Sequence, residues 1–128
     1  MANLPSMTPY LIRAFYEWSV DNDFTPQLSV LAEPEDYRVI VPSNYVTNNE
    51  IVLNISPTAC DSLQLGNDLI TFKARFAGKV ESISIPVDRV KAIFIREEGY
   101  GMRFDVAPMK KPKMSGDQPK RGLVKVED

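Results

Sequence analysis

The sequence contains no histidine and a single cysteine, Cys60. Histidine is the commonest general base and the commonest zinc ligand, so its absence excludes the usual catalytic triads and zinc sites. One cysteine cannot form an internal disulfide, and its neighbours Ala59 and Asp61 carry no positive charge that would lower the pKa of its thiol. We therefore expect no cofactor, no metal and no enzymatic activity, and we interpret Cys60 as a structural or incidental residue.

Long hydrophobic runs are also missing. No apolar stretch approaches the roughly 20 residues that a membrane-spanning helix needs. The N-terminal segment MANLPSMTPY lacks a basic region followed by a long apolar stretch, which is the pattern of a secretory signal. Together with the single cysteine, these absences predict a protein of the reducing cytoplasm that has no membrane partner.

Two further patterns are too weak to support a catalytic or nucleotide site. The carboxylate pairs Glu35-Asp36 and Glu97-Glu98 fall in predicted turns, where solvated charge is the ordinary interpretation. The glycines of Gly99-Tyr100-Gly101 precede no predicted helix, so they do not form a phosphate-binding loop. We expect neither glycosidase-type chemistry nor nucleotide binding.

The charge is unevenly distributed along the 128 residues. Residues 1–105 contain 9 basic and 14 acidic side chains, whereas residues 106–128 contain 6 basic and 3 acidic ones. An acidic body argues against nonspecific binding of nucleic acid, because such binding depends on a basic surface that displaces counterions from the phosphates. The length allows one domain with a single core, which we place in residues 1–105.

One helix is predicted near the N-terminus, from Thr8 to about Asp21. Thr8 is a suitable capping residue, and Pro9 is favoured at the first helical position because its missing N–H costs nothing there. An apolar face recurs with helical spacing and is widened by flanking residues. Its members are Leu11, Ala14, Phe15 and Trp18, with Tyr10, Ile12 and Ser19 beside them. Either this face packs on its own domain, or part of it pairs with a second copy of the chain.

Short β-rich segments separated by turn residues follow the helix. We predict strands at residues 27–31, 37–41, 51–55, 69–76, 80–85 and 92–96. The segment 69–76 alternates well, with Ile70, Phe72, Ala74 and Phe76 on one face, and the apolar run 92–95 predicts a strand buried on both faces. The predicted fold is therefore mainly β with an N-terminal α-helix, either a curled β-sandwich or a small, partly open barrel.

Exposed strand edges offer a way to hold an extended peptide. Asn54, Lys73 and Arg75 are polar residues of predicted strands with apolar neighbours. Peptides commonly bind along such edges, where backbone pairing supplies affinity and side-chain pockets supply selectivity. The alternative is that these three side chains are simply solvated.

Four ordered blocks of the sequence carry a family resemblance. PYLIRAFYEWSVDNDFTPQL, IVLNISPTA, LQLGNDLITFKARFAG and AIFIREEGYGMRF occupy residues 9–28, 51–59, 63–78 and 92–104. With them the chain resembles the stringent starvation protein B family, whose members are adaptors of the bacterial ClpXP protease. The resemblance implies binding of the ssrA degradation tag, delivery of tagged proteins to the unfoldase ClpX, and a β-sandwich similar to the Sm and SH3 folds. It also implies a homodimer formed through the helix, by Tyr10, Leu11, Ala14, Phe15 and Trp18.

The same resemblance implies a tag-binding groove built from two strand blocks. Its residues are Val52, Leu53, Asn54, Ile55, Phe72, Lys73, Ala74, Arg75 and Phe76, with Met102 and Phe104 at its mouth. The part of the tag that the adaptor reads is polar and includes acidic residues, so Lys73 or Arg75 is the natural partner for its charge. An exposed ion pair of this kind contributes only about 0.2 to 1 kcal/mol.

The C-terminal residues differ from the body in composition. Residues 106–121 are rich in Pro, Lys and Gly and predict a flexible linker. The resemblance implies that the tip, residues 122–128, binds ClpX through Leu123, Val124, Lys125 and Val126. A linker of about 15 to 18 residues reaches roughly 20 to 25 Å, which raises the effective concentration of a weak tip at its partner.

The alternative function is an RNA-binding Sm-like module. It is motivated by the predicted sandwich or barrel and by the basic tail. This alternative predicts RNA binding that weakens steeply with salt.

Overall fold

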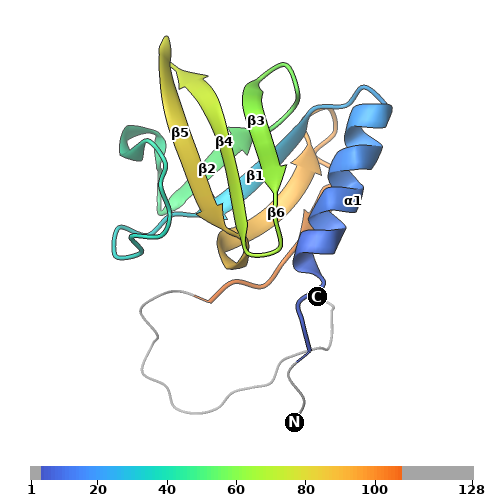
Figure 1. The fold of residues 1–128 in the computed structure, drawn as a ribbon, viewed down its shortest axis with the longest axis horizontal. Coiled ribbons are helices and arrows are strands. Elements are labelled where there is room, and N and C mark those ends of the chain that lie inside the picture. Colours follow the sequence, from blue (N-terminus) through green and yellow to red (C-terminus); the bar gives the residue numbers. More distant parts are fainter. Residues whose placement is uncertain (1–3, 108–128) are drawn as a thin grey trace.

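The computed structural model describes residues 4–107, which form one helix, two short 3-10 helices and seven strands (Figure 1). In chain order these elements are α1 (Thr8–Asp21), β1 (Pro26–Leu31), η1 (Ser43–Tyr45), β2 (Glu50–Asn54), β3 (Cys60–Leu65), β4 (Leu69–Phe76), β5 (Lys79–Pro86), η2 (Val87–Arg89), β6 (Val90–Ile95) and β7 (Gly101–Arg103).

The strands form two open antiparallel sheets. One sheet has the strand order β2-β1-β6-β7 and the other has the order β3-β4-β5. Figure 1 shows the strands of the two sheets crossing, with α1 along one side of them. The predicted class, mainly β with an N-terminal helix, is confirmed, and of the two predicted forms the open sandwich is the one observed.

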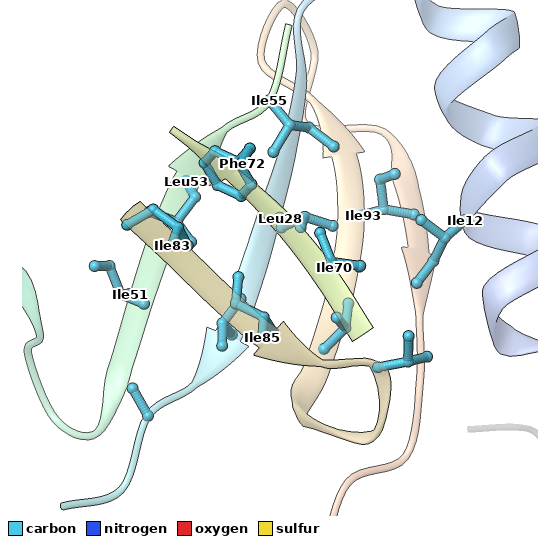
Figure 2. Close-up of a cluster of buried hydrophobic side chains, with 14 residues drawn as sticks. Ile12, Leu28, Ile51, Leu53, Ile55, Ile70, Phe72, Ile83, Ile85 and Ile93 are labelled. Carbon is cyan, nitrogen blue, oxygen red and sulfur yellow. The ribbon is translucent and has the colours of Figure 1, made fainter. Parts of the chain in front are cut away.

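The core lies between the two sheets. Leu28, Leu53 and Ile93 come from the four-stranded sheet and meet Ile70, Phe72 and Ile85 from the other sheet, all at most 3% exposed. Figure 2 shows these side chains pointing toward one another, with Ile12 of α1 joining at the side. The alternation predicted for residues 69–76 is confirmed, because Ile70 and Phe72 are buried and Ala74 and Phe76 pack against the core.

The helix has the predicted bounds but a different cap. Met7 is the N-cap residue, and the backbone N–H of Thr8 donates to Ser6 Oγ at 3.1 Å, so Thr8 is not the cap. Pro9 lies in the first turn as predicted. At the other end, Asn22 Nδ2 donates to the carbonyl of Trp18 at 2.8 Å, which satisfies one of the last helical acceptors.

One predicted strand is absent and two observed strands were missed. Residues 37–41 form no strand, and only Ile40 makes an isolated bridge, to Ser84 of β5. Strands β3 and β7 were not predicted. The pairing of β3 shifts register between Asp61 and Gln64, around a positive φ of 59° at Ser62, so its sequence shows no regular alternation. The other five predicted strands agree with β1, β2, β4, β5 and β6 to within two residues.

Strand β6 is less buried than its apolar run predicts. Ile93 and Ile95 are buried, whereas Ala92 and Phe94 are half-buried on the opposite face. One face of β6 points into the sandwich, and none of the described elements covers the other face as completely.

The connection from β1 to β2, residues 32–49, crosses from one sheet to the other; we call it the β1–β2 excursion. Ile40 N donates to Ser84 O at 2.8 Å, and Ser84 N donates to Ile40 O at 3.0 Å, so the excursion pairs with the free edge of β5. Further along, the ring of Tyr45 packs on Phe76 of β4, with the ring centroids 5.0 Å apart. The excursion therefore links the two sheets before the chain returns to β2.

Candidate functional site

Strand β2 lies at the edge of its sheet and pairs with β1 alone among the described strands. Ile55 N donates to Pro26 O at 3.0 Å, so Ile55 and every second residue before it turn their backbone groups toward β1. Backbone groups alternate in direction along an antiparallel strand, so Val52 and Asn54 turn theirs outward. No backbone hydrogen bond within residues 4–107 engages these outward groups, so this length of β2 is an open edge.

The open edge does not run the whole length of β2. Thr47 N donates to Glu50 O at 2.9 Å, and Glu50 N donates to Thr47 O at 3.0 Å. The preceding turn therefore closes the edge at Glu50 and leaves it open at Val52 and Asn54. The side chain of Val52 is 49% exposed, whereas its neighbour Leu53 is only 2% exposed and points into the core.

The turn after β2 is shaped by side chains. Asn54 Oδ1 accepts a hydrogen bond of 2.9 Å from Ser56 N, and Ser56 O accepts one of 2.9 Å from Ala59 N. Asparagine side chains often bond to nearby backbone groups in this way, which favours a turn over continuation of the strand. It carries the chain from β2 across to β3 in the other sheet, where Cys60 lies opposite Ala74.

A hollow of about 250 Å³ lies where this turn meets the end of β4. Its walls come from the turn and the start of β3 on one side and from the β4–β5 hairpin on the other. The lining residues are Thr58, Ala59, Cys60, Asp61, Lys73, Ala74, Arg75 and Val80. Such a hollow accommodates a small side chain next to exposed backbone.

Opposite charges surround the hollow. Lys73 and Arg75 are exposed on β4, and Asp61 lies directly opposite Lys73 in the β3–β4 pairing. Arg75 Nη1 donates to Gly78 O at 3.5 Å, which leaves the guanidinium near the surface of the hairpin. Lys73 and Arg75 are the two cations in the lining of the hollow, and Asp61 is its acidic residue.

The cysteine in the wall is not set up for nucleophilic chemistry. Burial raises the pKa of the Cys60 thiol above its ordinary value, and the negative charge of Asp61 raises it further. The thiol faces the carbonyl of Ser56 at 3.6 Å. Because the thiolate is the nucleophile, this environment fits the structural role predicted for Cys60.

The structure brings together only some of the predicted groove residues. Lys73, Ala74 and Arg75 line the hollow, and Val52 and Asn54 form the open edge of β2. Leu53, Ile55 and Phe72 are at most 3% exposed and belong to the core, so they support the site from beneath. Phe76 is half-buried under Tyr45.

Met102 and Phe104 lie elsewhere. Both pack against the core, Met102 beside a hollow between β6 and β7 and Phe104 beside another hollow near η2. They share no described hollow with Lys73 or Arg75. Sequence reasoning missed Thr58, Ala59, Asp61, Val80 and Tyr45, because the turn and the register shift that place them are not visible as a periodic pattern.

The residues of the predicted dimer face differ in exposure. Tyr10 is 56% exposed and Trp18 is 42% exposed, with Ala14 exposed between them, whereas Leu11 and Phe15 are half-buried. The residues of α1 that bury themselves most completely are Ile12 and Ser19. Tyr10, Ala14 and Trp18, spaced four residues apart, thus form an outward apolar stripe.

Several expectations fall partly or wholly outside the described residues. These are the linker beyond Ala107 and the tip with Leu123, Val124, Lys125 and Val126. Within residues 4–107, no group of three or more Cys, Asp or Glu side chains is placed to hold a metal ion. In the same range, no helix is both long and apolar enough to cross a membrane.

The fold and the site define a small two-sheet β-sandwich with an N-terminal helix and an open strand edge. Comparison with known proteins is specific: the chain belongs to the stringent starvation protein B family, whose sequence model matches residues 6–125. It is 47% identical over 97 residues to a protein of Haemophilus influenzae named stringent starvation protein B homolog. That alignment spans 76% of this chain and 63% of the relative, so the chain matches less than two-thirds of the relative's length.

Proposed function

We propose that this protein is an adaptor that binds the ssrA degradation tag and tethers tagged proteins to the ClpX unfoldase, so that ClpXP degrades them faster. The family membership supports an adaptor role. The open edge of β2 at Val52 and Asn54 is the observation that supports peptide binding most directly. An extended tag adds to this edge as a further strand, and its backbone takes up the outward groups.

The hollow at the turn that follows β2 supplies the selectivity in this proposal. A small tag side chain enters between Ala74 and the turn residues Thr58 and Ala59. An acidic tag residue lies near Lys73 or Arg75, both of which are exposed. Because exposed ion pairs are weak, these two cations adjust selectivity more than they add affinity.

The proposal also assigns roles to the helix α1, the linker and the C-terminal tip. Two copies pair through the outward stripe of α1, Tyr10, Ala14 and Trp18, extended by Leu11 and Phe15. The linker of residues 106–121 carries the tip of residues 122–128, and Leu123, Val124 and Val126 are its apolar contacts with ClpX. The adaptor catalyses nothing; it raises the local concentration of substrate at its partner in the cytoplasm.

The first test separates the backbone edge from the side chain. Val52→Pro removes the outward N–H of β2 without removing a hydrogen bond to β1, and proline is tolerated at such edge positions. One hydrogen bond has a net value of about 0.5 to 1.5 kcal/mol. Val52→Pro should therefore weaken binding of a fluorescent ssrA peptide, measured by anisotropy, by roughly threefold to tenfold.

Val52→Ala is the matched control, because it shortens the side chain and keeps the N–H. It should bind the peptide within about twofold of the unaltered protein. Equal affinities for all three proteins would show that the tag does not pair with this edge. If the unaltered protein ignored the tag but bound RNA with a steep salt dependence, the alternative Sm-like function would replace the adaptor proposal.

A further inference from the structure

An ion cluster with a buried centre anchors the start of the β1–β2 excursion. It consists of Glu33, Asp36 and Arg38 from the excursion and Asp88 and Arg89 from η2; we call it the Arg89 cluster. The Arg89 side chain is 8% exposed and the Asp36 side chain is 1% exposed. Charges so far from water are stable only when they are paired, so separating the excursion from η2 is costly.

The contacts of the cluster join two separate parts of the chain. Arg38 makes a bidentate pair with Asp36: Nε donates to Oδ1 at 2.9 Å and Nη2 donates to Oδ2 at 2.8 Å. Arg89 Nε lies 3.3 Å from Asp88 and 3.8 Å from Asp36, and Arg89 Nη1 lies 3.8 Å from Glu33. Arg89 is thus the shared cation that connects η2 to the excursion.

Three successive anchors then fix the path of the excursion over the β3-β4-β5 sheet. The Arg89 cluster is the first, the paired hydrogen bonds of Ile40 with Ser84 are the second, and the packing of Tyr45 on Phe76 is the third. Phe76 belongs to the same end of β4 as Ala74 and Arg75, which line the proposed tag-binding hollow. The excursion also ends directly in the turn that leads into β2 and its open edge.

We infer that the Arg89 cluster is a positioning device for tag binding: it holds the β1–β2 excursion docked, and the docked excursion holds Phe76 and the edge of β2 in the geometry that receives the peptide. This inference rests on the proposed function. None of the five cluster residues lines the hollow beside Ala74, so the cluster acts through the excursion and not by contact.

The physical mechanism is a shift in population. The excursion has a docked state, in which all three anchors are made, and an undocked state, in which the Arg89 contacts are lost and the other two anchors open with them. Only the docked state has the complete binding surface, so the observed dissociation constant rises in inverse proportion to the docked fraction. A variant that keeps the sandwich folded but weakens the first anchor binds the tag more weakly.

Arg89→Met tests the inference, because it keeps an unbranched, flexible side chain and removes the charged guanidinium. If the docked fraction falls to about one fifth, the dissociation constant of the ssrA peptide rises about fivefold. Amide hydrogen exchange at Ile40 and Tyr45, whose N–H groups donate to Ser84 O and Pro42 O, should accelerate by at least this factor, because exchange follows the undocked fraction, which is small in the unaltered protein. Arg89→Lys restores the charge without the planar fork and should recover part of both effects.

Ile93→Val is the matched control for a loss of stability alone. It trims the core on β6, away from the excursion, and should lower the melting temperature without changing peptide affinity or exchange at Ile40. Measurements are made on the full chain at a temperature where every variant is folded. If Arg89→Met does not fold, Arg89→Lys alone decides, with a rise in dissociation constant of at least twofold expected.

The two possible failures are distinguishable. Unchanged affinity and unchanged exchange at Ile40 and Tyr45 in a destabilised Arg89→Met protein would show that the cluster only adds stability. A normal protein that fails to bind the tag would overturn the proposed function, while the exchange comparison would still report whether Arg89 docks the excursion. Faster exchange with unchanged affinity would show docking without any role in binding, and would overturn the inference.

Discussion

At the scale of single residues, the acidic side chain of Asp36 shows how much a local pattern can mislead. The pair Glu35-Asp36 predicts solvated charge in a turn, and Glu35 is indeed exposed. Asp36 is buried, because Arg38 covers it and Arg89 approaches it from a distant part of the chain. No local sequence rule reveals that partner, so the burial could not be predicted. By contrast, the structural role of Cys60 follows from its immediate neighbours and was predictable.

The hydrogen bonds from Arg38 hold the pKa of Asp36 below its ordinary value of 3.8, although burial alone would raise it. A carboxyl whose pKa is lower in the folded state stabilises the fold above its unfolded pKa, and this contribution disappears as the pH falls through the folded pKa. Asp36→Asn should therefore lower the free energy of unfolding at pH 7 by about 1 to 3 kcal/mol, since it removes charged hydrogen bonds.

Urea unfolding of the original protein and the Asp36→Asn variant, measured from pH 7 down to about pH 3, checks the sign. The difference between the two should be constant near neutral pH and should shrink below the ordinary Asp pKa. Glu50, whose pKa is lowered by the hydroxyl of Ser29 and by Lys91, is present in both proteins and cancels. A difference that grew as the pH fell would contradict the assignment.

At the scale of elements, predictability followed the regularity of the pattern. Strand β4 was predicted with its observed bounds because its apolar residues alternate without interruption between two turns. Strand β3 was missed because the register shift near Ser62 breaks that alternation. The segment 37–41 has strand-forming residues, but tertiary contacts with β5 place it in a loop with one bridge. Strand β2 was predictable as a strand, whereas its place at a sheet edge and the turn that leads to the hollow were not, because both depend on the tertiary arrangement.

The β4–β5 hairpin offers a test at this scale. Ala77 and Gly78 form its two-residue turn, both with positive φ, 52° and 82°. This is the type I′ geometry, which favours asparagine before glycine, whereas alanine is strained there. Ala77→Asn should raise the free energy of unfolding by about 0.4 to 1 kcal/mol, as measured by urea denaturation.

Gly78→Ala is the opposite change in the same turn, and it should lower the stability by a similar or larger amount. Peptide affinity should be unchanged by Ala77→Asn, because Ala77 does not line the hollow. A destabilised Ala77→Asn protein would show that the turn is not of this type in solution.

At the scale of the whole molecule, α1 is a helix with two apolar faces. Its inner face buries Ile12 and Ser19, and its outer stripe exposes Tyr10, Ala14 and Trp18. The sequence predicted the extra apolar surface but could not assign each residue to a face. In the proposed function, a second copy of the chain is the partner of the outer stripe.

Ala14→Glu places a charge at the centre of this stripe without disturbing the core of its own domain. Sedimentation equilibrium should show a shift from dimer to monomer, with at least a tenfold weaker association, because a buried unpaired carboxylate costs several kcal/mol. Asp21→Ala changes the charge of the same helix outside the stripe and should remain dimeric. A monomeric original protein, or a dimeric Ala14→Glu protein, would contradict this interface.

The pairing of β1 with β6 has a consequence for biosynthesis. Gln27 lies opposite Phe94, so β1, one of the two central strands of the larger sheet, meets its neighbour β6 only after most of the chain has been made. Such sequence-distant pairing slows folding. Until β6 emerges from the ribosome, one edge of β1 in the nascent chain is unpaired. Unpaired strand edges of this kind promote aggregation and are bound by chaperones.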